Sequence, residues 1–200
     1  SEEGTVVIAT QSIGTSTTKI NALEVGESFI DVAGPIGKPS EFCNIDITKD
    51  AYYCFIAGGL GAAPIYPQAK YLHEKGIHCD VILGARSSVN LVYKKELEQV
   101  CDKVYVCTDG GSEGFHGLVT AQLEKAVKED GKKYTQAVAI GPMIMMKFAT
   151  LTASSLNIPV IVSLNTLMVD GTGMCGACRI TVDGVTRFAC VEGPEFDGTK

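Results

Sequence analysis

The chain has 200 residues, of which 46% are hydrophobic and 20% charged, enough for one good core with a small appendage or for two small domains. Its net charge is -6 and it contains no basic run, which argues against nucleic acid as a partner. The most apolar stretch, residues 137–146, is well short of the roughly 20 residues that cross a bilayer. We therefore expect a cytoplasmic protein without a membrane span.

Three extended segments are predicted first, over residues 5–10, 17–23 and 28–33, separated by turn residues. They are rich in β-forming residues but too few to close a barrel. From residue 51 the pattern changes, and apolar runs alternate with helical periodicity, which indicates βαβ units around a parallel sheet. The predicted strands are 52–57, 78–83, 103–107, 136–140 and 159–164. The predicted helices are 63–74, 91–100, 117–129 and 143–155.

A glycine-rich turn, residues 58–64, joins the first of these strands to a helix. Such a turn exposes backbone N–H groups to a pyrophosphate, although it is not a full GxGxxG motif and also occurs for packing alone. Arg86, Asp109 and the pair Gly141-Pro142 follow later strands, at the edge where open α/β sheets bind ligands. Arg86 is either a ribose or phosphate ligand or a solvated side chain. Asp80 has a spacing suited to a ribose-binding acid, but its mid-strand position argues against that role.

The carboxyl-terminal segment places Asp170, Cys175, Cys178 and Cys190 around a glycine-rich turn, with a hairpin signal at Asp183-Gly184. This is the Cys-x4-Cys-x2-Cys spacing of plant-type 2Fe-2S proteins, with Asp170 in place of the first cysteine. The alternatives are a zinc site, a disulfide and a turn-capping role for Asp170. The remaining cysteines are predicted to be buried thiols that pack as small hydrophobic side chains: Cys43, Cys54, Cys79, Cys101 and Cys107.

These motifs, in this order, resemble the ferredoxin-reductase-type electron-transfer subunits. Residues 163–178 and 188–198 are most similar to the small subunits of NADH-dependent reduced ferredoxin:NADP oxidoreductases, which are flavin-bifurcating transhydrogenases. The electron-transfer subunits of class B dihydroorotate dehydrogenases share the architecture but have cysteine as the first cluster ligand, so Asp170 favours the transhydrogenase branch. The resemblance covers the whole chain.

The resemblance implies an α/β fold with part of an antiparallel flavin barrel (residues 1–48), a five-stranded parallel NAD(P)-binding sheet with helices on both faces (49–164), and a 2Fe-2S domain (165–200). The implied NAD(H) residues are Gly58, Gly59, Gly61, Ala62, Pro64, Arg86, Asp109, Gly141, Pro142 and Met145. The implied FAD residues are Gly14, Ser16, Thr17, Gly34, Pro35 and Gly37. The first half of the barrel is absent, so either a preceding region or another chain completes the flavin site.

NADH releases two electrons together whereas a 2Fe-2S cluster accepts one, so a flavin must stand between them, and FAD serves this purpose. The expected path runs from NADH through FAD to the cluster and then to a larger flavin and iron-sulfur subunit. No side chain is expected to act as an acid or base, and NADP(H) is possible because Arg86 suits a 2′-phosphate. A dihydroorotate dehydrogenase subunit is the alternative enzyme, and a zinc-stabilised nucleotide-binding regulatory module is the alternative from another class.

Overall fold

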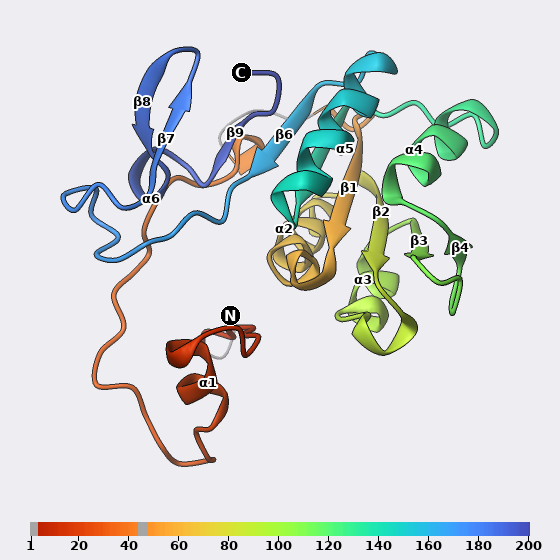
Figure 1. Cartoon of the computed structure of the whole chain (residues 1–200). Coiled ribbons are helices and arrows are strands. Elements are labelled where there is room, and N and C mark those ends of the chain that lie inside the picture. Colours follow the sequence, from red (N-terminus) through yellow and green to blue (C-terminus); the bar gives the residue numbers. More distant parts are fainter. Residues whose placement is uncertain (1–3, 44–47) are drawn as a thin grey trace. The chain divides into compact units, whose positions relative to one another are not determined.

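The computed structural model describes residues 4–43 and 48–200 (Figure 1). The chain divides into two compact units, Ser1–Pro35 and Ile36–Lys200, which are treated separately below. Residues 1–3 and 44–47, which fall in the predicted flavin segment, lie outside the described residues.

Among residues 4–35 of the first unit there is one helix, α1 (Thr15–Asn21), and an isolated bridge between Val25 and Glu27. The strand predicted over residues 17–23 is therefore wrong in large part, and residues 5–10 and 28–33 form no strand. A strand needs a neighbour for its backbone hydrogen bonds, whereas a helix satisfies them within itself. Apolar side chains of the predicted strand segments are exposed, among them Val6 and Ile30.

The second unit is built on a seven-stranded sheet in the order β4-β3-β2-β1-β5-β6-β9. Five strands match the predicted parallel sheet: β1 (Tyr52–Gly58), β2 (His78–Ala85), β3 (Lys103–Thr108), β5 (Gln136–Ile140) and β6 (Val160–Ser163). Two short edge strands were not predicted. They are β4 (Phe115–His116), parallel to β3, and β9 (Glu195–Asp197), antiparallel to β6.

Four helices cover the sheet close to the predicted positions: α2 (Ala62–Glu74), α3 (Lys94–Val100), α4 (Val119–Lys128) and α5 (Met143–Ser155). Helix α3 begins later than predicted because Tyr93 before it has a left-handed backbone, with φ of 58°. Short 3₁₀ turns occur at η1 (Glu41–Cys43), η2 (Gly59–Gly61) and η3 (Ser88–Asn90). The predicted hairpin is confirmed as β7 (Arg179–Val182) and β8 (Val185–Phe188), followed by α6 (Ala189–Glu192).

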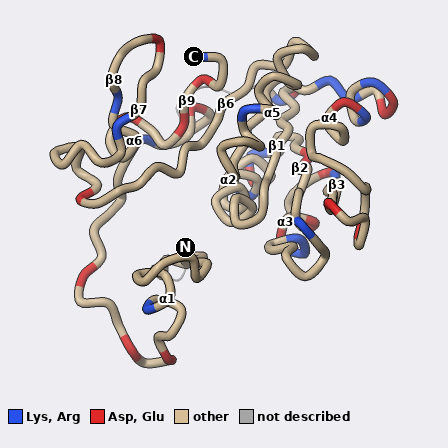
Figure 2. The backbone as a smooth tube through the Cα atoms, in the orientation of Figure 1, with Lys and Arg blue, Asp and Glu red and all other residues tan. Residues whose placement is uncertain are grey.

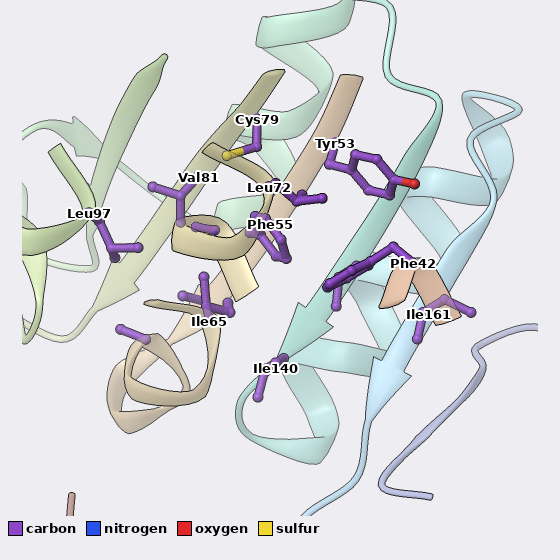
Figure 3. Packing of buried hydrophobic residues seen from close by; sticks show 14 of the residues in the cluster. Phe42, Tyr53, Phe55, Ile65, Leu72, Cys79, Val81, Leu97, Ile140 and Ile161 are labelled. Atoms are coloured by element: carbon purple, nitrogen blue, oxygen red, sulfur yellow. The ribbon is translucent and has the colours of Figure 1, made fainter. Parts of the chain in front are cut away.

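The sheet is buried on both faces, as a parallel sheet covered by crossover helices requires. Alternate residues of β1 point to opposite sides: Phe55 packs with α2 and α3, and Ile56 packs with α4 and α5. Figure 3 shows the first of these cores, where Ile65 and Leu72 of α2 lie against Phe55. This alternation explains why the strands read as continuous apolar runs.

A buried polar network lies in the first half of β2, away from the carboxyl ends of the strands. Asp80 is fully buried and accepts hydrogen bonds from Tyr52 and Tyr134, each at 2.8 Å, and its Oδ2 lies 2.9 Å from Lys132 Nζ. Lys132 also donates a hydrogen bond to the Tyr52 hydroxyl. Burial raises the pKa of Tyr52 to about 12, so this hydroxyl keeps its proton at neutral pH. Asp80 therefore has a structural partner set, in agreement with the expectation that it does not bind ribose.

Lys and Arg are interspersed with Asp and Glu along the described chain (Figure 2). Among the described residues, no helix has both the length and the apolar character needed to span a membrane.

Candidate functional site

The residues predicted to bind a nicotinamide nucleotide lie at one edge of the sheet. Gly58 ends β1 and pairs with Gly84, the last residue but one of β2, and the β5 partner of Ala57 is Ile140, directly before Gly141. The chain runs from β1 outward through β2 and β3 to the edge strand β4, and then returns to place β5 on the other side of β1. Open α/β sheets bind their ligands at such a switch point, outside the carboxyl ends of the strands.

Three glycines allow the two loops at this switch point to touch. A Cβ at Gly61 would lie 2.2 Å from the carbonyl oxygen of Ile140, and one at Gly58 would lie 2.5 Å from Met145 Sδ. Likewise, a Cβ at Gly141 would lie 3.0 Å from Gly58 Cα. These contacts directly support the explanation that the glycines are needed for packing. The same close approach of the loops places Met145 beside the β1–α2 turn.

We expect Gly61→Ala to destabilise the protein by about 1–3 kcal/mol, because the added methyl group meets backbone atoms that cannot move independently. The midpoint of urea unfolding measures the change. Gly110→Ala is the matched control, because nothing lies within 4 Å of its added Cβ, and it should shift the midpoint little. Equal midpoints for the two variants would contradict the close approach of the loops.

The two charged candidates at this edge are solvent-accessible. Arg86 and Asp109 are exposed, and each stands one residue past the paired residues Ala85 and Thr108 of β2 and β3. The Asp109 backbone N–H donates to the Ala85 carbonyl at 3.2 Å, which holds the two strand ends together. Ala62 is buried under the turn, whereas Pro64 and Pro142 are exposed. The predicted residues therefore lie on one edge of the sheet, as expected, and Arg86 and Asp109 are accessible there.

The candidate flavin residues divide between the two units. In the first, Thr17 Oγ1 accepts hydrogen bonds from the backbone N–H groups of Ile13 and Gly14, at 3.0 and 3.1 Å, so it caps α1. Ser16, Gly34 and Pro35 also belong to this unit. Gly37 belongs to the second unit, where its φ is +82° and an added Cβ would lie 2.7 Å from the Gly193 carbonyl oxygen. The structure therefore gives Thr17 and Gly37 local structural roles, each within its own unit.

The candidate cluster loop begins with Asp170, whose carboxylate faces inward on its own turn. Its Oδ1 accepts a hydrogen bond from the Thr172 N–H and its Oδ2 accepts one from the Cys175 N–H, both at 2.8 Å. These backbone bonds lower the pKa of Asp170, so it is a carboxylate at neutral pH. Gly171 and Gly173 have left-handed φ values of 74° and 82°, which tighten the turn without a steric penalty. The turn-capping role is thus present, and it also fixes an anionic oxygen beside Cys175.

Two of the candidate thiols lie together under an aromatic cover. Cys178 Sγ and Cys190 Sγ are 3.2 Å apart, both are buried, and Phe188 and Phe196 pack against them. The Cys190 N–H, 3.5 Å from Cys178 Sγ, lowers the pKa of Cys178, whereas the hydrogen bond shared by the two sulfurs raises the pKa of Cys190. Sequence reasoning missed the two phenylalanines, and only the proximity of Phe188 to Cys190 in the chain pointed to one of them.

The four candidate ligands therefore occur as two pairs, Asp170 with Cys175 and Cys178 with Cys190. In the described part of the chain, no group of three or more His, Cys, Asp or Glu side chains is assembled for a metal ion. The donor chemistry nevertheless fits an iron-sulfur cluster, because three thiols and a carboxylate supply anionic ligands on left-handed glycine turns. Cys175 is exposed, its N–H donates to Asp170 Oδ2, and its sulfur accepts a hydrogen bond from the Ala177 N–H at 3.5 Å.

Comparison with known proteins identifies both halves of the second unit. Residues 55–150 match the oxidoreductase NAD-binding domain, and residues 165–200 match the iron-sulfur cluster binding domain of dihydroorotate dehydrogenase B. A Thermotoga maritima protein described as an electron transfer subunit homolog of dihydroorotate dehydrogenase B (NAD(+)) is 43% identical over 199 residues, which are 100% of this chain and 68% of that protein. The chain belongs to this family of electron-transfer subunits.

Other proteins are also similar to this chain. An uncharacterized Clostridium beijerinckii protein is 51% identical over 98% of this chain and 67% of its own length. A chain of the NADH-dependent reduced ferredoxin-NADP oxidoreductase structure, studied for flavin-based electron bifurcation, is 43% identical with a TM-score of 0.82, over 94% of this chain and 65% of that one. The cytochrome b5 reductase domain of Ulva prolifera nitrate reductase shares the fold, with a TM-score of 0.58 at 21% identity.

The family assignment confirms the predicted resemblance, the ferredoxin-reductase-like α/β fold and the cofactor set of 2Fe-2S, FAD and NAD(H). The chain spans about two thirds of the length of these relatives. It is an oxidoreductase subunit, so the reading as a zinc-stabilised regulatory module is set aside. Two cysteine predictions need correction: Cys43 is exposed on η1 and Cys101 is half-buried, because both stand at element ends rather than within strands.

Proposed function

We propose that this subunit passes electrons between NAD(H), FAD and a 2Fe-2S cluster held by Asp170, Cys175, Cys178 and Cys190, and onward to a larger cytoplasmic flavin and iron-sulfur subunit. The observation that carries the proposal is the joining of an NAD-binding domain and an iron-sulfur domain in one compact unit. A 2Fe-2S cluster supplies one-electron transfer when bound. The chain's own residues supply ligands, orientation and a partly buried environment.

The proposed nucleotide residues are those at the carboxyl edge of the sheet. Arg86 and Asp109 are exposed there and available to phosphate and ribose, and Met145 stands beside the glycine turn. Gly14, Ser16, Thr17, Gly34, Pro35 and Gly37 remain the proposed flavin residues. The domain limits at residues 48 and 164 are likewise part of the proposal.

Within the family, we favour an electron-bifurcating NADH:ferredoxin/NADP oxidoreductase, because a chain of such an enzyme is 43% identical with a TM-score of 0.82 and because Asp170 replaces a cysteine. A dihydroorotate dehydrogenase B subunit is the second candidate, favoured by the description of the Thermotoga maritima relative and by the match over residues 165–200.

The purified native complex distinguishes the two candidates. We expect NADH and reduced ferredoxin together to reduce NADP⁺, with little reduction when either donor is omitted. Dihydroorotate-dependent reduction of NAD⁺ by the same preparation, without the coupled reaction, would instead establish the second candidate.

Replacing the carboxylate ligand tests the assignment of Asp170. We expect Asp170→Cys to retain a 2Fe-2S cluster with a modestly altered reduction potential, because carboxylate and thiolate both bring a negative charge, unlike the neutral histidines of Rieske centres. Potentiometric titration followed by electron paramagnetic resonance measures the potential. The control is Asp183→Asn at the exposed hairpin turn, which should leave the potential unchanged. Loss of the cluster in Asp170→Cys would refute the ligand assignment.

A further inference from the structure

A second pair of thiols lies on the nucleotide-binding sheet, apart from the four candidate cluster ligands. Cys79 Sγ and Cys101 Sγ are 3.8 Å apart. Cys79 belongs to β2 and is buried in the core shown in Figure 3, whereas Cys101 caps the end of α3 and is half-buried. Among the described residues outside the cluster segment, no other pair of cysteine sulfurs is in hydrogen-bond contact.

The backbone holds these two cysteines in register. The Asp102 N–H donates to the Cys79 carbonyl at 2.8 Å, and the Cys79 N–H donates to Asp102 Oδ2 at 2.8 Å. His78 Nδ1 lies 2.9 Å from the other carboxylate oxygen of Asp102, which anchors the same junction. A disulfide requires sulfurs about 2 Å apart, so the 3.8 Å between Cys79 Sγ and Cys101 Sγ must shorten as the bond forms, and the backbone hydrogen bonds hold the two residues beside one another meanwhile.

The two cysteines differ in their access to solvent. The hydrogen bond to Cys101 raises the pKa of Cys79, and burial raises it further, so Cys79 stays protonated, with the Val100 carbonyl oxygen and Cys101 Sγ each 3.8 Å from its sulfur. Its thiol is closed to solvent. Cys101 is therefore the sulfur that an external reagent meets first, and Cys79 is the one placed to resolve the product.

We propose that Cys79 and Cys101 are a reversible modification site, which forms an intramolecular disulfide by exchange with a low-molecular-weight disulfide such as oxidised glutathione. The Cys101 thiolate attacks one sulfur of the reagent, forms a mixed disulfide and expels one thiolate. Cys79 then attacks the Cys101 sulfur, the mixed disulfide breaks, and the Cys79 proton passes to the second departing thiolate. Two protein thiols are oxidised and one reagent disulfide is reduced to two thiols.

The bond would close the chain segment between the start of β2 and the end of α3. That segment contains Arg86 and the whole β2–α3 connection at the candidate nucleotide edge. Closing a loop removes conformations from the unfolded chain, so oxidation is expected to stabilise the protein. The thiol redox state of the surroundings would thus determine whether the segment that carries Arg86 is closed by a disulfide.

Peptide mapping of the intact holoprotein tests the proposal. The protein is incubated without denaturant in oxidised glutathione, its free thiols are blocked with iodoacetamide, and trypsin releases Cys79 in residues 76–86 and Cys101 in residues 96–103. We expect these two peptides to be joined, with the loss of two hydrogens, and dithiothreitol to separate them. We also expect the oxidised protein to unfold at higher urea concentration than the reduced protein.

Two variants make the result specific. Cys101→Ser should abolish both the joined peptide and the rise in the urea midpoint. Cys107→Ser removes a buried thiol from the neighbouring strand β3 and should retain both. Alkylated, unjoined peptides after oxidation would overturn the proposal, as would glutathione retained on Cys101 beside a free Cys79. An unchanged midpoint in protein whose peptides are joined would overturn the stabilising role. None of these outcomes depends on electron transfer, so they stand apart from the proposed function.

Discussion

Cys178→Ser is expected to abolish the iron-sulfur cluster and with it the one-electron activity of the subunit. Cys178 is buried, and its sulfur is 3.2 Å from that of Cys190 beneath Phe188 and Phe196. A serine hydroxyl is a much poorer iron ligand than a thiolate, because it keeps its proton at neutral pH. The loss of iron affinity should exceed the roughly 10- to 100-fold that follows removal of a group outside the ligand shell. Iron content, visible absorption and electron paramagnetic resonance of anaerobically purified protein measure it.

The matched control for this loss is Cys107→Ser. Cys107 is equally buried, on β3, and is not one of the candidate ligands. It should keep full iron content, and both variants should keep their NADH binding. A Cys178→Ser protein with the iron content and spectrum of the wild type would remove Cys178 from the ligand set.

Asp80→Ala is expected to lower the free energy of unfolding by about 3–5 kcal/mol, the usual result of removing one partner of a buried ion pair. Asp80 accepts from Tyr52 and Tyr134 and faces Lys132, whose side chain is only 23% exposed. The variant leaves a positive charge and two hydroxyls without their shared acceptor. Urea unfolding followed by circular dichroism measures the change.

An exposed ion pair supplies the comparison for Asp80. Glu74→Gln breaks the pair with Lys70 on α2, where both side chains are about half exposed, and should change the free energy of unfolding by less than about 1 kcal/mol. Similar losses in the two variants would mean that the network around Asp80 contributes no more than a surface contact does.

The parallel sheet could be predicted from the sequence because its strands are buried on both faces. A segment such as 52–57 must then be apolar at every position, and the glycines that follow it mark its end. Strands β4 and β9 escaped prediction because two or three residues carry no periodicity, and their existence depends on neighbours distant in the chain. Helix α1 shows the opposite error, since β-forming residues without a strand partner take up a locally bonded helix.

The kinds of residue that make up the candidate site could be predicted from the sequence, but the contacts between them could not. Glycine spacing and the three cysteines indicated which loops to consider, whereas the close contact of Gly61 with Ile140 follows from the placement of β5 beside β1. The capping of α1 by Thr17 and the contact of Gly37 with Gly193 are likewise matters of folded geometry. No local pattern encodes which of two distant segments will become neighbours.

The return of the chain through β9 limits how the cluster segment can move. The chain leaves the sheet after β6, forms the cluster segment, and rejoins the sheet at β9. Strand β9 pairs directly with β6 through Val162 and Phe196. Both ends of the segment between β6 and β9 are therefore held at the same strand of the sheet. Such a segment cannot swing as a tethered carrier does. For the proposed electron path, we therefore expect turnover to depend on the docking of a redox partner rather than on a travelling domain.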